Sequence, residues 1–92
     1  MGIRRIRQAF REGRYEYSIH ALEEMDEDEL IDSDVYHAIM RGQVVEKLTA
    51  DARGARFVVR GLSATGEADL EIVCRFLSSA ILRIITVYAV EK

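Results

Sequence analysis

The last third of the chain holds two apolar runs, residues 70–77 and 80–90, with almost nothing between them. Both runs are rich in β-branched and aromatic residues, which fit a pleated strand better than a helix. Two such runs around a short polar connection, here Ser78 and Ser79, predict an antiparallel β-hairpin. A hairpin this apolar belongs in the middle of a sheet, so the rest of the chain must cover it.

Apolar spacing predicts helices ahead of this hairpin. Ile3, Ile6 and Phe10 recur at helical spacing, and Gly13 follows as a C-terminal stop. Ser18 stands where a helix N-cap is expected, because its oxygen can accept an orphan backbone N–H two or three residues on. The predicted helices span about residues 3–12, 18–28 and 33–41.

The second and third helices each have a predicted buried stripe. In the second helix it consists of Ala21, Leu22 and Met25. In the third helix Ile31, Val35, Ala38 and Ile39 line one face at helical spacing, and the sequence leaves open whether Leu30 or Ile31 packs inward before the cap. Either Asp32 or Ser33 caps the third helix, and Gly42 is expected to end it in the left-handed conformation.

The strands are predicted at about residues 44–49, 56–62, 69–77 and 80–90, with turns at 51–54 and 65–67. Residues 14–17 are also expected to be extended. Helices followed by strands indicate an α+β fold, in which the N-terminal helices pack on one face of a four-stranded antiparallel sheet. Ninety-two residues suit one domain, 1–92.

Composition excludes several classes of protein. No apolar stretch approaches the roughly 18 residues of a membrane span, and the first residues lack a secretory signal. A single cysteine, Cys74, excludes an internal disulfide framework and fits a reducing cytoplasm, so we expect a cytoplasmic protein. That cysteine falls on an apolar strand face and is expected in the core. Two histidines and one cysteine at wide spacing predict neither a metal site nor a cofactor.

The net charge of −3 is unevenly distributed. Residues 1–15 carry five arginines and one glutamate, a net +4, whereas residues 16–34 carry nine acidic residues and no base, a net −9. In one interpretation these are solvated helix faces that attract each other within the fold or across a homodimer. In the other, a basic surface and an acidic surface bind partners.

Strand alternation predicts one polar face of the sheet. Because side chains alternate between the two faces of a strand, the most apolar sets are buried together and leave a common polar face. This face is predicted to carry Arg56, Arg60, Glu71, Arg75, Thr86 and Tyr88. In the last strand, strict alternation puts Leu82 and Ile84 on the side of Thr86, and Arg83 on the other. Charge pairing for solubility, with Glu71 between arginines, would give the same pattern.

Several short motifs resemble a known family. They are residues 18–21 (Ser-Ile-His-Ala), Met25, the capped helix 34–41 with Gly42, and residues 84–88 (Ile-Ile-Thr-Val-Tyr). In this order they resemble a group of small prokaryotic domains of unknown function, marked by a His-Ala pair that opens a helix and an "iITvY" final strand. That group is similar in fold to the RelE and BrnT toxins, and the resemblance covers about residues 15–90.

The family pattern typically reads His-Ala-x-x-Arg-Met-x-x-Arg. Here His20, Ala21 and Met25 match it, but Glu24 and Asp28 occupy the two arginine places. Both departures replace a cation by an anion.

The resemblance implies a small ribonuclease of a type II toxin–antitoxin module, in which the 2′-hydroxyl of RNA attacks the neighbouring phosphorus without a metal. Such cleavage needs a base, cations for the developing charge, and an acid for the leaving oxygen. His20 would act as base or acid, because a free imidazole titrates near neutral pH. Arg75 would stabilise the phosphorane and Tyr88 would donate a proton. These three residues are the candidate catalytic set.

The predicted RNA contacts are Arg56 and Arg60, which can hold phosphate bidentately, and Tyr17, which can stack on a base. The expected partners are RNA and an antitoxin that covers the basic sheet face. The alternative function is a catalytically inactive protein–protein interaction module of the same fold, in which the oppositely charged segments mediate dimer or partner contacts. In that case His20 merely fixes the entry to its helix.

Overall fold

The computed structural model describes residues 2–49, 54–78 and 80–90. These residues form α1 (Gly2–Arg11), β1 (Tyr15–Tyr17), α2 (Ile19–Glu27), α3 (Asp32–Arg41), β2 (Gln43–Leu48), β3 (Arg56–Leu62), β4 (Asp69–Phe76) and β5 (Leu82–Ala89). The α+β class is therefore confirmed, and the predicted helices and strands all exist. Residues 51–53 of one predicted turn, and Ser79 of the hairpin connection, lie outside the described residues.

The sheet differs from the predicted four antiparallel strands. In the described part of the chain it has five strands in the order β1-β5-β4-β3-β2, and β1 runs parallel to β5. The extended segment ahead of α2 supplies this fifth strand: Tyr15 pairs with Leu82 and Tyr17 with Ile84. An edge strand has unpaired backbone groups, so a short extended segment beside β5 satisfies them. The hairpin is central, as predicted, since β4 is the middle strand.

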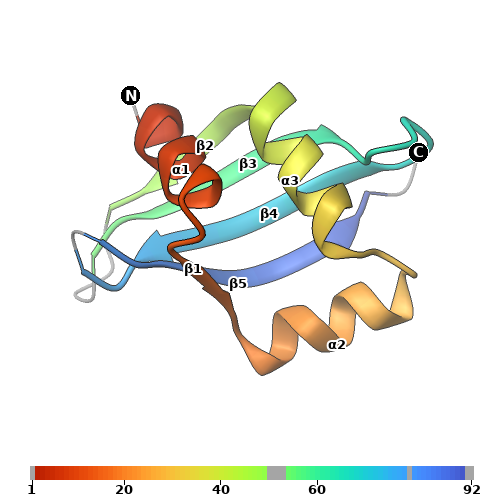
Figure 1. Ribbon diagram of the computed structural model, residues 1–92, viewed down its shortest axis with the longest axis horizontal. Coiled ribbons are helices and arrows are strands. Elements are labelled where there is room, and N and C mark those ends of the chain that lie inside the picture. Colours follow the sequence, from red (N-terminus) through yellow and green to blue (C-terminus); the bar gives the residue numbers. More distant parts are fainter. Residues whose placement is uncertain (1, 50–53, 79, 91–92) are drawn as a thin grey trace.

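Two helices cover one face of the sheet (Figure 1). α1 and α3 lie across this helix face, whereas α2 lies along the β5 side and packs against β5 and β1. We call the opposite side, towards which Arg56, Arg60, Glu71, Arg75, Arg83 and Tyr88 project, the open face. None of the helices that the structure describes is long and apolar enough to span a membrane.

The core between the sheet and the helices contains most of the predicted apolar residues. Its fully buried members include Ile6, Ala21, Val35, Ile39, Val59, Leu70, Ile72, Cys74, Leu82, Ile84 and Val87. One helix prediction is wrong: Leu22 is 50 % exposed because only one narrow stripe of α2 meets β5. Of the two residues left open before α3, Leu30 packs against the core, whereas Ile31, the N-cap residue, is 64 % exposed.

A β-bulge in β5 changes the predicted parity of the last strand. Cys74 pairs with Ile84 and Val73 with Thr86, so Ile85 is an extra residue. Leu82 and Ile84 are therefore buried on the helix face, opposite to the prediction, and Arg83 projects to the open face. After the bulge Thr86 and Tyr88 lie on the open face, as predicted.

Glycines allow α3 and β3 to approach each other closely. A Cβ on Gly61 would lie 2.3 Å from the carbonyl oxygen of Ala38, and a Cβ on Gly42 would lie 2.1 Å from that of Arg60. Gly42 has φ −87° and ψ −162°, so the predicted left-handed ending of α3 is wrong. Glycine stands there because a side chain would collide with the backbone of β3. By contrast, Gly13 after α1 has φ +73°.

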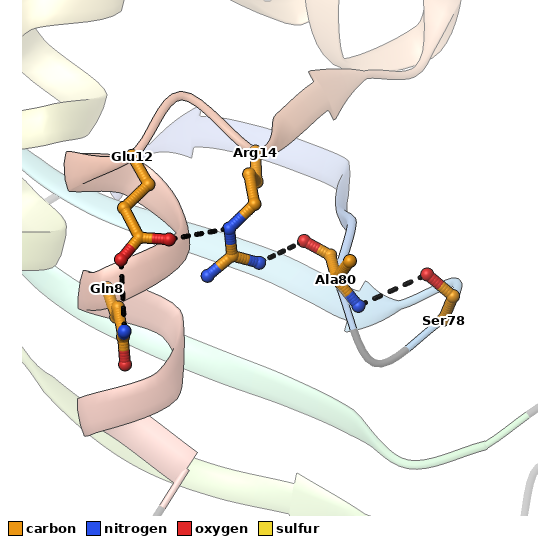
Figure 2. A network of polar contacts seen from close by, with 5 residues as sticks. All are labelled: Gln8, Glu12, Arg14, Ser78 and Ala80. Carbon is orange, nitrogen blue, oxygen red and sulfur yellow. Dashed lines mark hydrogen bonds and ion pairs between the residues drawn. The ribbon is translucent and has the colours of Figure 1, made fainter.

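Two arginines of the N-terminal segment bind backbone carbonyls. Arg7 of α1 donates to Ile39 O (3.0 Å) and Gly42 O (2.8 Å), at the negative C-terminal end of α3. Figure 2 shows the Arg14 guanidinium between the Glu12 carboxylate (2.8 Å) and the Ala80 carbonyl. The bonds of Arg7 join α1 to α3, and the bond of Arg14 joins the residues after α1 to the chain between β4 and β5. Part of the basic segment 1–15 therefore holds the fold together.

Candidate functional site

A cationic pocket lies on the open face, where α2 begins. It has a volume of about 510 Å³ and is lined by Ser18, His20, Arg56, Arg75, Leu77, Arg83 and Ile85. We call it the arginine pocket. Among the described residues its lining holds three arginines and one histidine but no carboxylate. Such a pocket suits a ligand that carries negative charge and accepts hydrogen bonds.

Sheet register brings the three arginines together. Arg75 and Arg83 are direct partners across β4 and β5, and Arg56 precedes Phe57, the partner of Cys74. All three therefore lie in one row across three strands. Like charges directly opposite each other destabilise a sheet. Glu16 of β1 offsets part of this repulsion through its ion pair with Arg83.

Ser18 holds the start of α2 against β5 and thereby positions His20. Its Oγ accepts from the backbone N–H of Ala21 (3.0 Å), which confirms the predicted N-cap. The same hydroxyl donates to Ile85 O (2.9 Å), and the backbone N–H of Ser18 donates to Ile84 O (2.9 Å). His20 follows two residues later, at the rim of the pocket, with 65 % of its side chain exposed.

Glu24 links His20 to the backbone of β5. Its Oε1 lies 3.5 Å from His20 Nε2 and accepts from the backbone N–H of Val87 (3.1 Å). One turn later Asp28 accepts from the backbone N–H of Ala89 (2.9 Å). Beyond the end of β1, these two carboxylates occupy the edge of β5. Glu24 and Asp28, which stand where the family pattern has arginines, therefore accept hydrogen bonds from the backbone of the sheet.

A second polar row crosses the open face four residues from the arginine row, about 13 Å along the strands. Arg60 Nε lies 3.6 Å from Glu71 Oε1, and the Tyr88 hydroxyl donates to Glu71. That hydrogen bond is the largest cause that raises the pKa of Tyr88 above its ordinary value near 10. Arg60 and Tyr88 therefore share the open face with Arg75 but do not line the arginine pocket.

Tyr17 lies away from the predicted RNA contacts, on the helix face. Its hydroxyl donates to Asp32 (2.5 Å), and the hydroxyl of Tyr15 donates to the same carboxylate (2.9 Å). Burial raises the pKa of Tyr17, with the Asp32 hydrogen bond as the next cause. β1 alternates like any strand, so Glu16, between the two tyrosines, reaches the open face instead.

Sequence reasoning missed Arg83 as a member of the pocket. A signal for it exists: Leu82-Arg83-Ile84 alternates in one phase, and Thr86-Val87-Tyr88 alternates in the opposite phase. Such a change of phase indicates a β-bulge between the two halves.

The second histidine, His37, and the single cysteine, Cys74, lie outside the arginine pocket. His37 Nδ1 lies 3.0 Å from Leu62 O, and Cys74 is fully buried, which raises the pKa of its thiol to about 12. Within residues 2–49, 54–78 and 80–90, no three His, Cys, Asp or Glu side chains are grouped so that they could hold a metal ion.

The fold and the site define a small α+β domain with a cationic pocket on an uncovered sheet face. A family model, "Domain of unknown function (DUF4258)", matches residues 17–89, and the chain belongs to this family. Comparisons with curated proteins and with solved structures gave no match. The matched region contains α2, α3 and β2–β5, and therefore all residues that line the arginine pocket.

Proposed function

We propose that this chain binds single-stranded RNA on the open face, with a phosphodiester in the arginine pocket. The observation that carries the proposal is the row of Arg56, Arg75 and Arg83 beside His20 in one pocket. A phosphate has only acceptor oxygens, and arginine donors match it bidentately. A sheet face can contact the phosphates and the unstacked bases of one strand together, which favours single-stranded RNA.

RNA cleavage is the catalytic form of the same proposal. His20 takes the proton of the 2′-hydroxyl, whose oxygen forms a bond to the adjacent phosphorus. The bond from phosphorus to the 5′-oxygen breaks, leaving a 2′,3′-cyclic phosphate and a 5′-hydroxyl. Glu24 orients the imidazole, and the arginines stabilise the developing charge. Tyr88 is held by Glu71 outside the pocket, so a water molecule protonates the leaving oxygen in place of the tyrosine first expected there.

In this form the chain resembles the RelE and BrnT toxins, and an antitoxin would act by covering the open face. The carboxylates at Glu24 and Asp28 do not weaken this proposal, because both are engaged with the backbone of β5. Neither of them lines the arginine pocket.

Fluorescence anisotropy with a labelled oligouridylate tests binding. We expect Arg75→Ala and Arg56→Gln each to weaken affinity by about tenfold or more, since each removes a charge-assisted contact. Arg4→Ala is the matched control, because Arg4 is an exposed residue of α1 and does not line the arginine pocket. Circular dichroism verifies that the variants are folded. Equal affinity of all folded proteins would refute the proposal.

A second assay separates cleavage from binding. We expect the RNA oligomer to yield a 2′,3′-cyclic phosphate detectable by mass spectrometry, and a fully 2′-deoxy oligomer to bind without being cut. His20→Ala should abolish the product and retain binding. Induced expression in bacteria should slow growth for the natural chain but not for His20→Ala or Arg75→Ala. If the chain binds the RNA oligomer but yields no cleavage product, cleavage is refuted and RNA binding stands.

The interaction-module alternative has one observation in its favour. On the outer side of α2, Ile19 is 76 % and Leu22 50 % exposed beside the acidic Glu23. A second copy of the chain would offer the exposed arginines of α1, Arg4 and Arg11. Sedimentation at about 50 and 200 mM salt tests this homodimer, because contacts between such charges weaken with screening. A monomer at both salt concentrations excludes it.

A further inference from the structure

A second pocket lies at the other end of β3, between the C-terminus of α3 and the first residues of β2 and β4. Its volume is about 340 Å³. The polar groups that line it come from His37, Arg41, Gln43, Arg60 and Asp69. Gly42 and Gly61 form part of its wall, and the close contact of α3 with β3 excludes side chains there.

This pocket differs chemically from the arginine pocket. It contains a carboxylate, that of Asp69, as well as guanidinium groups. A phosphate offers only acceptors, so Asp69 would repel it. The lining instead suits a neutral ligand that presents donors on one edge and acceptors on another. Nucleobases have this property.

Among the bases, guanine fits this combination best. Its N1–H and N2 amino group are adjacent donors for a carboxylate, whereas its O6 and N7 are the acceptors that arginine binds bidentately. Asp69 supplies the acceptor, and Arg41 and Arg60 supply the donors. The Arg60 Nε lies 3.6 Å from Glu71 Oε1, which holds the guanidinium in place while 42 % of the side chain stays exposed.

The ring of His37 is held in place beside these groups. Its Nδ1 lies 3.0 Å from Leu62 O, so in the neutral ring that nitrogen carries the proton. A fixed aromatic ring offers a surface on which a base can stack, as in proteins that bind unpaired bases. Leu62, which also lines the pocket, adds an apolar contact.

The two pockets are connected by β3. Arg56 lines the arginine pocket and Arg60 lines the second pocket, four residues or about 13 Å further along the strand. A single strand of RNA covers that distance within a few nucleotides. We infer that the second pocket binds a guanine base of the RNA strand whose phosphodiester occupies the arginine pocket, and so gives the domain a preference for guanosine. This inference rests on the proposed function.

Anisotropy with a short labelled oligouridylate tests the inference, comparing the plain oligomer with versions that carry one central guanosine, adenosine or inosine. We expect guanosine to improve affinity about tenfold over uridine or adenosine. Inosine lacks the 2-amino group that Asp69 accepts and should recover only part of this gain. Asp69→Asn should reduce the guanosine preference to about twofold without changing the affinity for plain oligouridylate.

Glu67→Gln is the matched control, because it also removes one carboxylate near this turn but does not line the second pocket. Arg41→Ala should weaken the guanosine preference in the same way as Asp69→Asn. If the natural chain binds all four oligomers equally while Arg75→Ala loses binding, the guanine pocket is refuted and the phosphate site stands. If no oligomer binds at all, both proposals are refuted.

Discussion

The Glu24 carboxylate accepts a hydrogen bond from the backbone N–H of Val87 at 3.1 Å, so a helix side chain completes the edge of a sheet. Asp28 does the same for Ala89 at 2.9 Å. β1 covers only the first part of β5, and Ser18 continues the edge by donating to Ile85 O. The helix α2 thus covers the part of the β5 edge beyond β1, which would otherwise be a site for pairing with another chain.

Removing these acceptors should destabilise the domain. We expect Glu24→Ala and Asp28→Ala each to lower the free energy of unfolding by about 1–2 kcal/mol, because a backbone N–H loses a charged acceptor. Urea unfolding measures the change. Glu24→Gln should cost less, since its amide oxygen still accepts. Glu27→Ala is the control: it is exposed, and its effect should stay within about 0.5 kcal/mol. Equal stability of all four variants would contradict the assignment of the edge contacts.

The close contact of α3 with β3 makes Gly61 intolerant of any side chain. We expect Gly61→Ala to lower the free energy of unfolding by about 3 kcal/mol or more, because its Cβ would lie 2.3 Å from Ala38 O. Gly66→Ala is the comparison. It has φ +78° but nothing within 4 Å of its Cβ, so only backbone strain of about 1 kcal/mol applies. Denaturant unfolding measures both, and a smaller loss for Gly61→Ala than for Gly66→Ala would contradict the packing.

Salt dependence gives a count of phosphate contacts. Three arginines in the pocket predict a slope of log affinity against log salt concentration of about −2 for a single strand. Removing one arginine should make this slope shallower by about 0.7. We therefore expect Arg83→Ala to give a slope of about −1.4 between roughly 50 and 200 mM salt. Arg11→Ala, on the exposed side of α1, should leave the slope unchanged. A slope near zero for the natural chain would exclude phosphate binding.

The two tyrosines on Asp32 predict a loss of stability at alkaline pH. Burial, followed by the hydrogen bond to Asp32, raises the pKa of Tyr15 from about 10 to about 12. A raised pKa means that the folded state holds its proton more tightly, so the stabilisation is complete below pH 10 and declines as the pH rises towards 12. The thermal midpoint should fall over this interval. The thermal midpoint of the Tyr15→Phe/Tyr17→Phe variant should fall less over the same pH interval. If the midpoint of the variant and that of the natural chain depend on pH in the same way, the two tyrosines do not cause the loss of stability.

Local patterns in the sequence predicted most of the elements. Ser18 was predicted as an N-cap and is one, because a cap depends on residues three positions away. The β4–β5 hairpin followed from residue types and a short connection. The cap of α3 was placed one or two residues late: Ile31 occupies the position, and Asp34 accepts its backbone N–H.

The candidate site was predicted only in part. Arg56 and Arg75 lie together beside His20, whereas Arg60 and Tyr88 belong to a different row and Tyr17 to the other face. Arg83 was missed because strict alternation was carried through the whole last strand, past the change of phase that marks the bulge. Each of these differences in position depends on which distant residue lies opposite a given one.

By itself the sequence determined the kinds of elements, their order and most of the residues that form the core, since hydrophobic periodicity and caps act over a few neighbouring residues. Only the tertiary structure decided the pairing of β1 as a fifth strand, the carboxylates that complete the β5 edge and the glycine contacts beneath α3. The physical reason is that backbone hydrogen bonds between distant segments and steric fit across layers have no local signature.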